Sequence, residues 1–241
     1  RVLFRSPLKY WLLSTSYSQS DYNQTVAGAS ESYSYSGKSK LIGADLSRVL
    51  YRDAKRKTTA SVGGWYRESQ NYINDVEVEV QRRKTAGWKA SLDHSEYLSH
   101  ATLNGNVTYK RGTGAFNAMY APEEDFGEAY TRVGIWQANA SLQVPFKVGQ
   151  QNLQYLAEWR MQHSKKPLTP QDRFSIGNRY TVRGYDGEQT LLADNGFLVR
   201  NELSGSIPKL PMQWYSGIDY GEVGGKTAHE PNPLVGTSLL G

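Results

Sequence analysis

The sequence predicts an all-β protein, and within that class a transmembrane antiparallel β-barrel. Its 241 residues include 23 Gly, 17 Tyr and 6 Trp, which favour strands and turns, and no Cys, which excludes disulfides and thiolate sites. Only 38% of the residues are hydrophobic, and no run approaches the roughly 18 consecutive apolar residues of a spanning helix. Instead, apolar and polar residues alternate over runs of about ten, longer than the roughly 5–6 residues of strands in soluble sandwiches.

The alternation predicts about eleven strands. They are expected at 8–19, 22–36, 38–51, 57–71, 76–92, 99–111, 130–146, 151–163, 197–206, 212–223 and 233–241. The pattern is clearest from Ala101 to Lys110. The barrel domain is expected to span 7–241, because residues 1–6 resemble a translated sequencing adapter and are expected to be non-native. The sequence is also expected to be a fragment, since it ends inside a predicted strand.

The two faces of the predicted strands differ in polarity. In a barrel that lies in lipid, the apolar face of each strand meets the membrane and the polar face lines a wet lumen. The apolar positions Leu103, Val107, Trp136 and Trp159 are therefore expected to point outward. Asp219 falls on the polar face of its strand and is expected to point into the lumen.

One predicted strand, 76–92, alternates poorly. Its valines share a face with Arg82 and Lys84, and two cations in the middle of a bilayer would cost several kcal/mol. Either this part lies outside the bilayer, or a bulge shifts the register. The sequence leaves both possibilities open.

One connection is long and lacks sustained alternation, from 165 to 196. Loops of this length in compact domains are usually functional or disordered. This loop contains Val182-Arg183-Gly184-Tyr185, which follows Ile176-Gly177-Asn178-Arg179-Tyr180-Thr181 and precedes Asp186-Gly187. Further along, a predicted strand carries Gly217-Ile218-Asp219-Tyr220-Gly221.

These motifs resemble those of the TpsB family, the two-partner-secretion outer-membrane transporters of ShlB/FhaC/HecB type. The Val182–Tyr185 segment is similar to the VRGY/F motif of the family's lumenal loop, and the segment around Asp219 to its Asp-x-Gly strand motif. The resemblance covers residues 7–241. It implies a barrel of sixteen strands, of which about eleven would be present here, without the periplasmic POTRA domains of the family.

The resemblance also implies a function and its residues. The barrel would secrete a large exoprotein of haemolysin, adhesin or contact-toxin type, unfolded, across the bacterial outer membrane, with lipid as its other partner. Arg183 would pair with Asp219 to pin the loop, and a bidentate Arg–Asp pair is geometrically specific. Gly184 would permit a sharp turn, and Tyr185 would pack on the inner wall. The other residues of this lumenal loop lock and its supporting loop would be Val182, Gly221, Gly177, Arg179, Tyr180, Asp186 and Gly187.

The sequence indicates no other chemistry. The net charge is +5, but the cations are scattered, so no nucleic-acid partner is expected. Asp186, Glu188 and Asp194 lack the spacing of an EF-hand, and no Ser elbow or phosphate loop is present. No metal, no cofactor and no enzymatic activity are therefore expected. Glu158 and Glu202 are expected to be lumenal carboxylates that meet Arg160 and Arg200.

Three other functions stay open from the sequence. An outer-membrane assembly factor of the same superfamily would carry the loop motif as well, although the segments around it favour secretion. A passive diffusion porin would not need the motif. A soluble carbohydrate-active β protein would be soluble without detergent.

Overall fold

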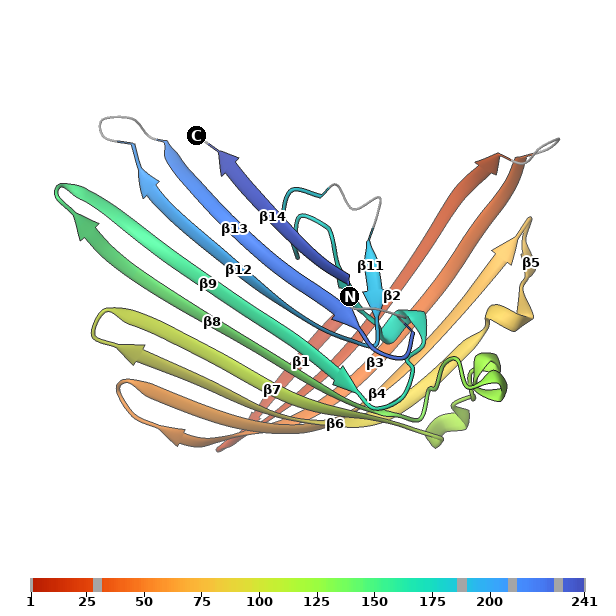
Figure 1. The fold of residues 1–241 in the computed structure, drawn as a ribbon. Helices are drawn as coiled ribbons and strands as arrows, with labels where there is room; N and C mark the ends of the chain where they lie inside the picture. The colour runs from red at the N-terminus through yellow and green to blue at the C-terminus, as the bar shows by residue number, and fades with distance from the viewer. Residues whose placement is uncertain (1, 28–31, 186–189, 208–211, 228–231, 241) are drawn as a thin grey trace. The chain divides into compact units, whose positions relative to one another are not determined.

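The computed structural model describes residues 2–27, 32–185, 190–207, 212–227 and 232–240, and most of them lie in β-strands (Figure 1). The strands are β1 (Val2–Leu8), β2 (Trp11–Ala27), β3 (Ser32–Arg52), β4 (Arg56–Ile73), β5 (Val76–Glu77), β6 (Arg83–Leu98), β7 (Ala101–Thr113), β8 (Gly134–Val148), β9 (Gln151–Ser164), β10 (Phe174–Ile176), β11 (Leu191–Ala193), β12 (Asn195–Ser206), β13 (Gln213–Gly224) and β14 (Asn232–Leu240). The short 3-10 helices are η1 (Glu79–Gln81), η2 (Ala115–Asn117), η3 (Pro122–Phe126) and η4 (Pro170–Asp172). Within the described part of the chain, no helix has the length and apolar character needed to cross a membrane.

The main sheet follows the order of the chain. Its strands are arranged β1-β2-β3-β4-β6-β7-β8-β9-β12-β13-β14, with β5 attached to β4, while β10 and β11 form a separate pair. The sheet order therefore skips the chain order at two places, at β5 between β4 and β6 and at the β10–β11 pair between β9 and β12. The prediction of an all-β fold with about eleven long strands is confirmed.

The chain divides into two compact units. The first contains Arg1–Arg48, Ala60–Ala90 and Lys110–Gly134, and the second contains Val49–Thr59, Ser91–Tyr109 and Ile135–Gly241.

The first unit begins with a strand that the sequence did not predict. Residues 2–8 form β1 and pair with 11–17 of β2, although the barrel domain was expected to begin at residue 7. Their non-native origin stays a prediction. Strand β2 then continues to Ala27 and pairs with β3 along its whole length. The strand breaks expected near 20–21 and at 37 therefore do not occur in this described pair of strands.

These breaks were wrong, because polar residues and a glycine also fit inside a long paired strand. Asp21 lies opposite Lys38, and Gly37 lies opposite Tyr22, in an unbroken antiparallel register. The ring of Tyr22 occupies the space where a Cβ on Gly37 would stand. The glycine therefore makes room for a cross-strand ring within the strand.

The poorly alternating segment 76–92 is not one strand. Asn74 and Asp75 have positive φ and close a tight hairpin onto the two-residue β5. After η1, β6 begins at Arg83. Arg82 therefore precedes β6, where its guanidinium pairs with Glu77 at 2.6 Å. Lys84 lies within β6, and its Nζ pairs with Glu68 at 3.4 Å. The break thus separates the valines from both cations.

In the second unit, β8, β9, β12 and β13 pair in a continuous register. Opposite residues share a face, so one face carries Trp136, Trp159 and Ile218, and the other carries Glu158 and Asp219. Trp136 is 51% exposed and Ile218 62% exposed, and the ring of Trp136 contacts that of Tyr109 with centroids 4.8 Å apart. The apolar face is thus a surface and not a packed core.

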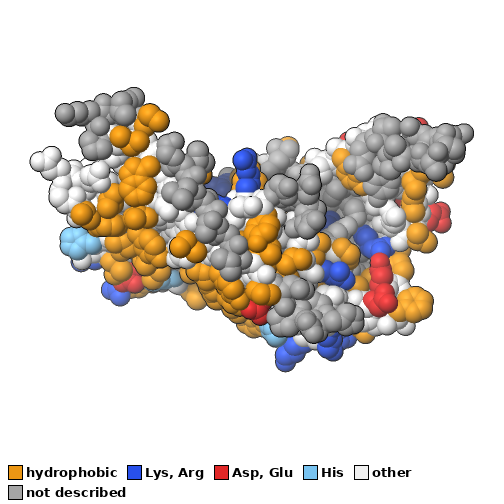
Figure 2. Space-filling view, turned by 45° about the horizontal axis from the view of Figure 1, so that its top comes forward, with side chains coloured by type: hydrophobic (Ala, Val, Ile, Leu, Met, Phe, Trp, Pro, Cys, Tyr) orange, Lys and Arg blue, Asp and Glu red, His pale blue; other side chains and the backbone are white. Residues whose placement is uncertain are grey.

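Hydrophobic side chains gather on the molecular surface. Figure 2 shows them as a continuous area over part of the visible face, with Lys, Arg, Asp and Glu mainly outside it. The buried hydrophobic core of the second unit lies elsewhere, under the β10–β11 pair. Its members are Phe174, Ile176, Val182, Ala193, Leu198 and Val223.

Candidate functional site

The connection between β9 and β12, residues 165–194, is called the motif loop below. It is folded, because β10 and β11 pair antiparallel within it, with Phe174 opposite Ala193. This small hairpin contacts β12 and β13 and lies on the sheet face that carries Leu198 and Val223. The shared core of Ile176, Val182 and these two residues holds the loop against that face.

Strand β13 provides a cradle for the tip of the motif loop. Gly217 and Gly221 flank Asp219 on the same face, since alternate residues of a strand share a face. A Cβ on Gly221 would stand 2.8 Å from Cγ2 of Val182, and a Cβ on Gly217 would collide with the guanidinium of Arg183. The two glycines therefore leave the space that the loop tip occupies.

Arg183 fills this cradle and pairs with Asp219. Its Nε donates to Oδ2 of Asp219 at 2.7 Å, and its Nη2 donates to Oδ1 at 2.7 Å. The backbone N–H of Arg183 donates to the same Oδ2 at 3.0 Å. One carboxylate thus accepts both a bidentate guanidinium and the backbone of the loop.

A second acid completes the arrangement. Nη1 of Arg183 donates to Oε2 of Glu202 on β12, and Nη2 also donates to the backbone carbonyl of Asn201 at 3.1 Å. We call Arg183, Asp219 and Glu202 the loop lock. Asp219 is 0% exposed and Arg183 8%, so the pair is shielded from water.

In the loop lock, the positive charge of Arg183 is compensated by the carboxylates of Asp219 and Glu202. The hydrogen bonds that the Arg183 guanidinium donates to Asp219 are the main cause that raises its pKa, with a further contribution from Glu202. Breaking a buried pair by removing one partner typically costs about 3–5 kcal/mol, because the other charge is left uncompensated. The lock is therefore specific in geometry and sensitive to the loss of any member.

The backbone around Arg183 explains how the tip reaches the sheet. The amide of Asn178 donates to Oγ1 of Thr181 at 3.1 Å, and the amide of Thr181 donates back to the carbonyl of Asn178 at 3.0 Å. This closed turn precedes the motif. Gly184 follows Arg183 with φ of 95°, a left-handed conformation that a glycine adopts without strain.

A second carboxylate anchors the base of the motif loop. Asp194 is 1% exposed, and its Oδ1 accepts the backbone N–H of Leu168 at 2.7 Å. Its Oδ2 accepts the backbone N–H of Thr227 at 3.0 Å. Asp194 thus joins the start and the end of the loop to the segment that follows β13.

The predicted site residues occupy different surroundings. Val182 is buried in the core, Tyr185 packs against that core, and Gly177 has φ of 100°. Arg179 and Tyr180 are exposed on the loop surface, Tyr180 by 73%. The predicted residues Asp186 and Gly187, like Glu188, lie outside the described residues.

The contacts of two carboxylates near the motif loop differ from those that the sequence predicted or were not predicted. Glu202 was expected to meet a strand arginine, but it contacts Arg183 of the loop, and Arg200 pairs with Glu158 at 3.0 Å instead. The alternation that puts Glu202 and Asp219 on one face could have indicated both as partners of Arg183. Asp194 binds two backbone amides, and no sequence signal identifies those.

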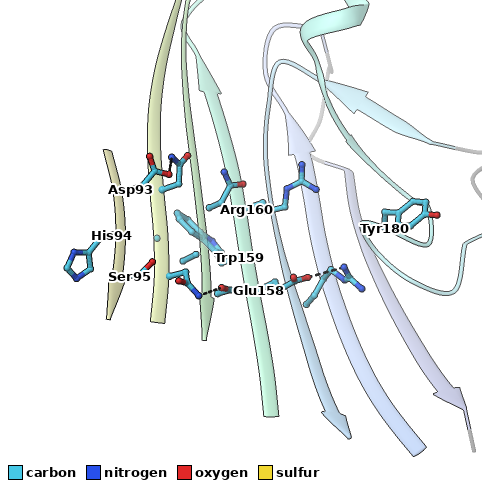
Figure 3. Close-up of a pocket in the computed structure, with 14 residues that line it drawn as sticks. Asp93, His94, Ser95, Glu158, Trp159, Arg160 and Tyr180 are labelled. Atoms are coloured by element: carbon cyan, nitrogen blue, oxygen red, sulfur yellow. Dashed lines mark hydrogen bonds and ion pairs between the residues drawn. The ribbon is translucent and has the colours of Figure 1, made fainter. Parts of the chain in front are cut away.

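A polar hollow lies beside the motif loop on the same face (Figure 3). Its volume is about 490 Å³. Arg200 bonds Glu158 across its floor, and Asn106 donates to Asp93 at 2.8 Å. His94 of β6 and Tyr180 of the loop both line it and stand at opposite ends of the residues drawn in Figure 3. No group of acids and histidines among the described residues could hold a metal ion.

The comparisons with known proteins agree on one family. The model of the family described as haemolysin secretion/activation protein ShlB/FhaC/HecB matches residues 1–239. The chain is 32% identical over its whole length to the outer membrane transporter CdiB-2 of Burkholderia pseudomallei and covers 41% of that protein. It is 28% identical over 87% of its length to the outer membrane transporter CdiB of Dickeya dadantii and covers 37% of that protein.

The solved structures give the same result. CdiB from Acinetobacter baumannii superimposes with a TM-score of 0.86 at 34% identity, over 98% of this chain and 42% of that one. CdiB from Escherichia coli gives 0.84 at 26% identity, over 97% of this chain and 44% of that one. The antiparallel sheet therefore has the fold of an outer-membrane β-barrel transporter and is integral to that membrane, and the chain spans less than half the length of these relatives.

Proposed function

Because the chain belongs to the ShlB/FhaC/HecB family of haemolysin secretion/activation proteins, we propose that it is the pore-forming part of a two-partner-secretion transporter. Its passenger would be one large exoprotein of haemolysin, adhesin or contact-toxin type, which crosses the outer membrane unfolded. The observation that carries this proposal is the loop lock, which pins a folded loop to the polar face of the sheet through Arg183 and Asp219.

The two faces of the second unit fit such a pore. The face with Trp136 and Ile218 is apolar and exposed, as expected for contact with lipid. The opposite face carries the motif loop, the polar hollow and side chains whose amide and hydroxyl groups can form hydrogen bonds. We assign this face to the lumen. Such groups offer hydrogen bonds of modest net strength, which an extended chain can exchange as it slides.

The reaction would be translocation without covalent chemistry. The passenger would be driven outward by its own folding outside the cell, since a chain that folds on one side cannot return through the pore. The protein's part is to hold the path open and to control the loop that lies on the lumenal face. Arg183, Asp219 and Glu202 would set how firmly that loop is held.

The test uses cells that express the full-length transporter with its exoprotein, and measures the exoprotein released into the medium. Arg183→Ala should reduce secretion severalfold while the barrel still inserts, because the loop tip loses its bonds to Asp219. Arg52→Gln is the matched control, since Arg52 is an exposed arginine at the end of β3. Full secretion by Arg183→Ala, with the loop lock removed, would overturn the proposal.

A further inference from the structure

Arg200 lies between two carboxylates on the lumen-assigned face. It stands directly opposite Glu158 on β9 and directly opposite Asp219 on β13. Its Nη1 bonds Oε2 of Glu158 at 3.0 Å, whereas its Nε lies 3.9 Å from Oδ2 of Asp219.

The Nε of Arg200 is a donor without an acceptor. It is buried and has no hydrogen-bond partner among the residues that the structure describes, and the distance of 3.9 Å to Asp219 is too long for a hydrogen bond. Oδ2 of Asp219 already accepts both the backbone N–H and the Nε of Arg183. Arg200 therefore lies next to the carboxylate of Asp219, which is already hydrogen-bonded to Arg183.

Release of the motif loop would separate the carboxylate of Asp219 from the guanidinium of Arg183. Asp219 is 0% exposed while the loop tip covers it, and when Arg183 leaves, this carboxylate loses its main counter-ion, which is unfavourable. A movement of about 1 Å would bring the Nε of Arg200 within hydrogen-bond distance of Asp219. The cation that would compensate the released state is thus already in place.

We propose that Arg200 is a positioning residue that takes over Asp219 when Arg183 leaves, so that the motif loop can be released without leaving the Asp219 carboxylate uncompensated. Arg200 rests on Glu158 while the loop is locked and moves toward Asp219 when it opens. The inference rests on the proposed function at one point, which is that the motif loop must be released for transport. The release itself is a local opening of the kind that folded proteins undergo.

The first experiment measures stability without any passenger. The full-length transporter, purified in detergent micelles, is titrated with urea and the folded barrel is followed by its heat-modifiable mobility. In an Arg183→Ala background, Arg200→Gln should lower the ratio of folded to unfolded protein at least about tenfold, because Asp219 then has no cation. Arg160→Gln is the matched control in the same background, since Arg160 is an exposed arginine of β9.

Charge-specific rescue separates this role from a purely structural one. Asp219→Asn should restore the Arg183→Ala, Arg200→Gln protein, and Arg200→Lys should largely preserve stability in the Arg183→Ala background. If the double variant fails to insert at all, recovery with Asp219→Asn still decides the matter. Equal stability of the Arg200→Gln and Arg160→Gln combinations, or failure of Asp219→Asn to rescue, would overturn the proposal.

The second experiment measures release of the loop directly. Val182 is 0% exposed, so a Val182→Cys reporter in a cysteine-free full-length transporter reacts with a maleimide only when the loop lifts. Arg200→Gln should slow this reaction at least about fivefold, the lower end of typical coupling between sites. Arg200→Lys should slow it less. An unchanged rate in Arg200→Gln would refute the inference, whereas the secretion assay of Arg183→Ala tests the proposed function separately.

Discussion

The pairing of Arg183 with Asp219 makes a quantitative prediction about secretion and loop release. Three hydrogen bonds join the two residues, two of them between charged groups at 2.7 Å. Arg183→Ala leaves Asp219 with Arg200 at 3.9 Å. Asp219→Ala leaves Arg183 with Glu202 but deprives its backbone N–H of an acceptor. Partial compensation places each loss near the lower end of the usual range for a broken buried pair, about 3 kcal/mol.

This loss of free energy sets the ratio of locked to released loop. About 3 kcal/mol corresponds to a change of roughly a hundredfold in the ratio of locked to released loop, since each 1.4 kcal/mol is a factor of about ten. The double variant Arg183→Ala, Asp219→Ala should lose about the same as either single variant, because all three remove one interaction. The interaction energy in the cycle should therefore also be about 3 kcal/mol.

Two measurements check the cycle. Maleimide reaction of the Val182→Cys reporter gives the released population, and exoprotein in the medium gives secretion, with heat-modifiable mobility confirming that each barrel is inserted. A charge swap, Arg183→Asp with Asp219→Arg, should recover little, because a guanidinium on the strand cannot reproduce the geometry of one on the loop. Strictly additive losses in the double variant would refute the reasoning, since the two residues would then act separately.

Three further outcomes follow from the same structure. Gly217→Ala should release the loop as Arg183→Ala does, because its Cβ would collide with the guanidinium, whereas Gly105→Ala has nothing closer than 4.0 Å and should leave the reporter rate unchanged. Asp194→Asn should destabilise the base of the loop by about 1–3 kcal/mol, since one of its two backbone amide bonds is lost; the exposed Asp125→Asn serves as control in urea unfolding, and equal midpoints would contradict the anchor. Leu142→Lys, near the middle of β8 on the apolar face, should cost about 2–4 kcal/mol of folding in lipid vesicles, while Gln143→Lys on the opposite face should not; equal losses would contradict the assignment of faces.

The strands could be predicted because their pattern has a physical cause. Alternation in β8 and β9 follows from one apolar and one polar face, and the register of Trp136 to Ala140 against Trp159 to His163 keeps those faces aligned. Strand ends were harder, because Asp21 and Gly37 are turn formers that a polar strand face also accepts. The pairing of Arg183 with Asp219 was expected only through the family resemblance.

The remaining contacts of the site depend on three-dimensional packing. Glu158, Glu202, Arg160 and Arg200 share one face by alternation, so the sequence allows several pairings of these acids and arginines. The choice is made by the loop, whose tip places Arg183 next to Glu202 and leaves Glu158 to Arg200. Asp194 binds the amides of Leu168 and Thr227, which are far from each other in the chain, and backbone donors carry no side-chain signal.

The chemistry of the loop lock also predicts whether it must open. Hydrophobic replacement of a buried ion pair is often neutral or stabilising by about 1–4 kcal/mol, so a barrel that needed only a fixed loop would gain by having apolar residues at 183 and 219. Arg183→Met with Asp219→Leu should accordingly keep the loop docked, with slow maleimide reaction of Val182→Cys, and yet reduce secretion. An ion pair differs from such an anchor in that a second cation, Arg200, can take over one partner. Normal secretion by the docked apolar variant would mean that the lock is a static support and that its charge has no part in transport.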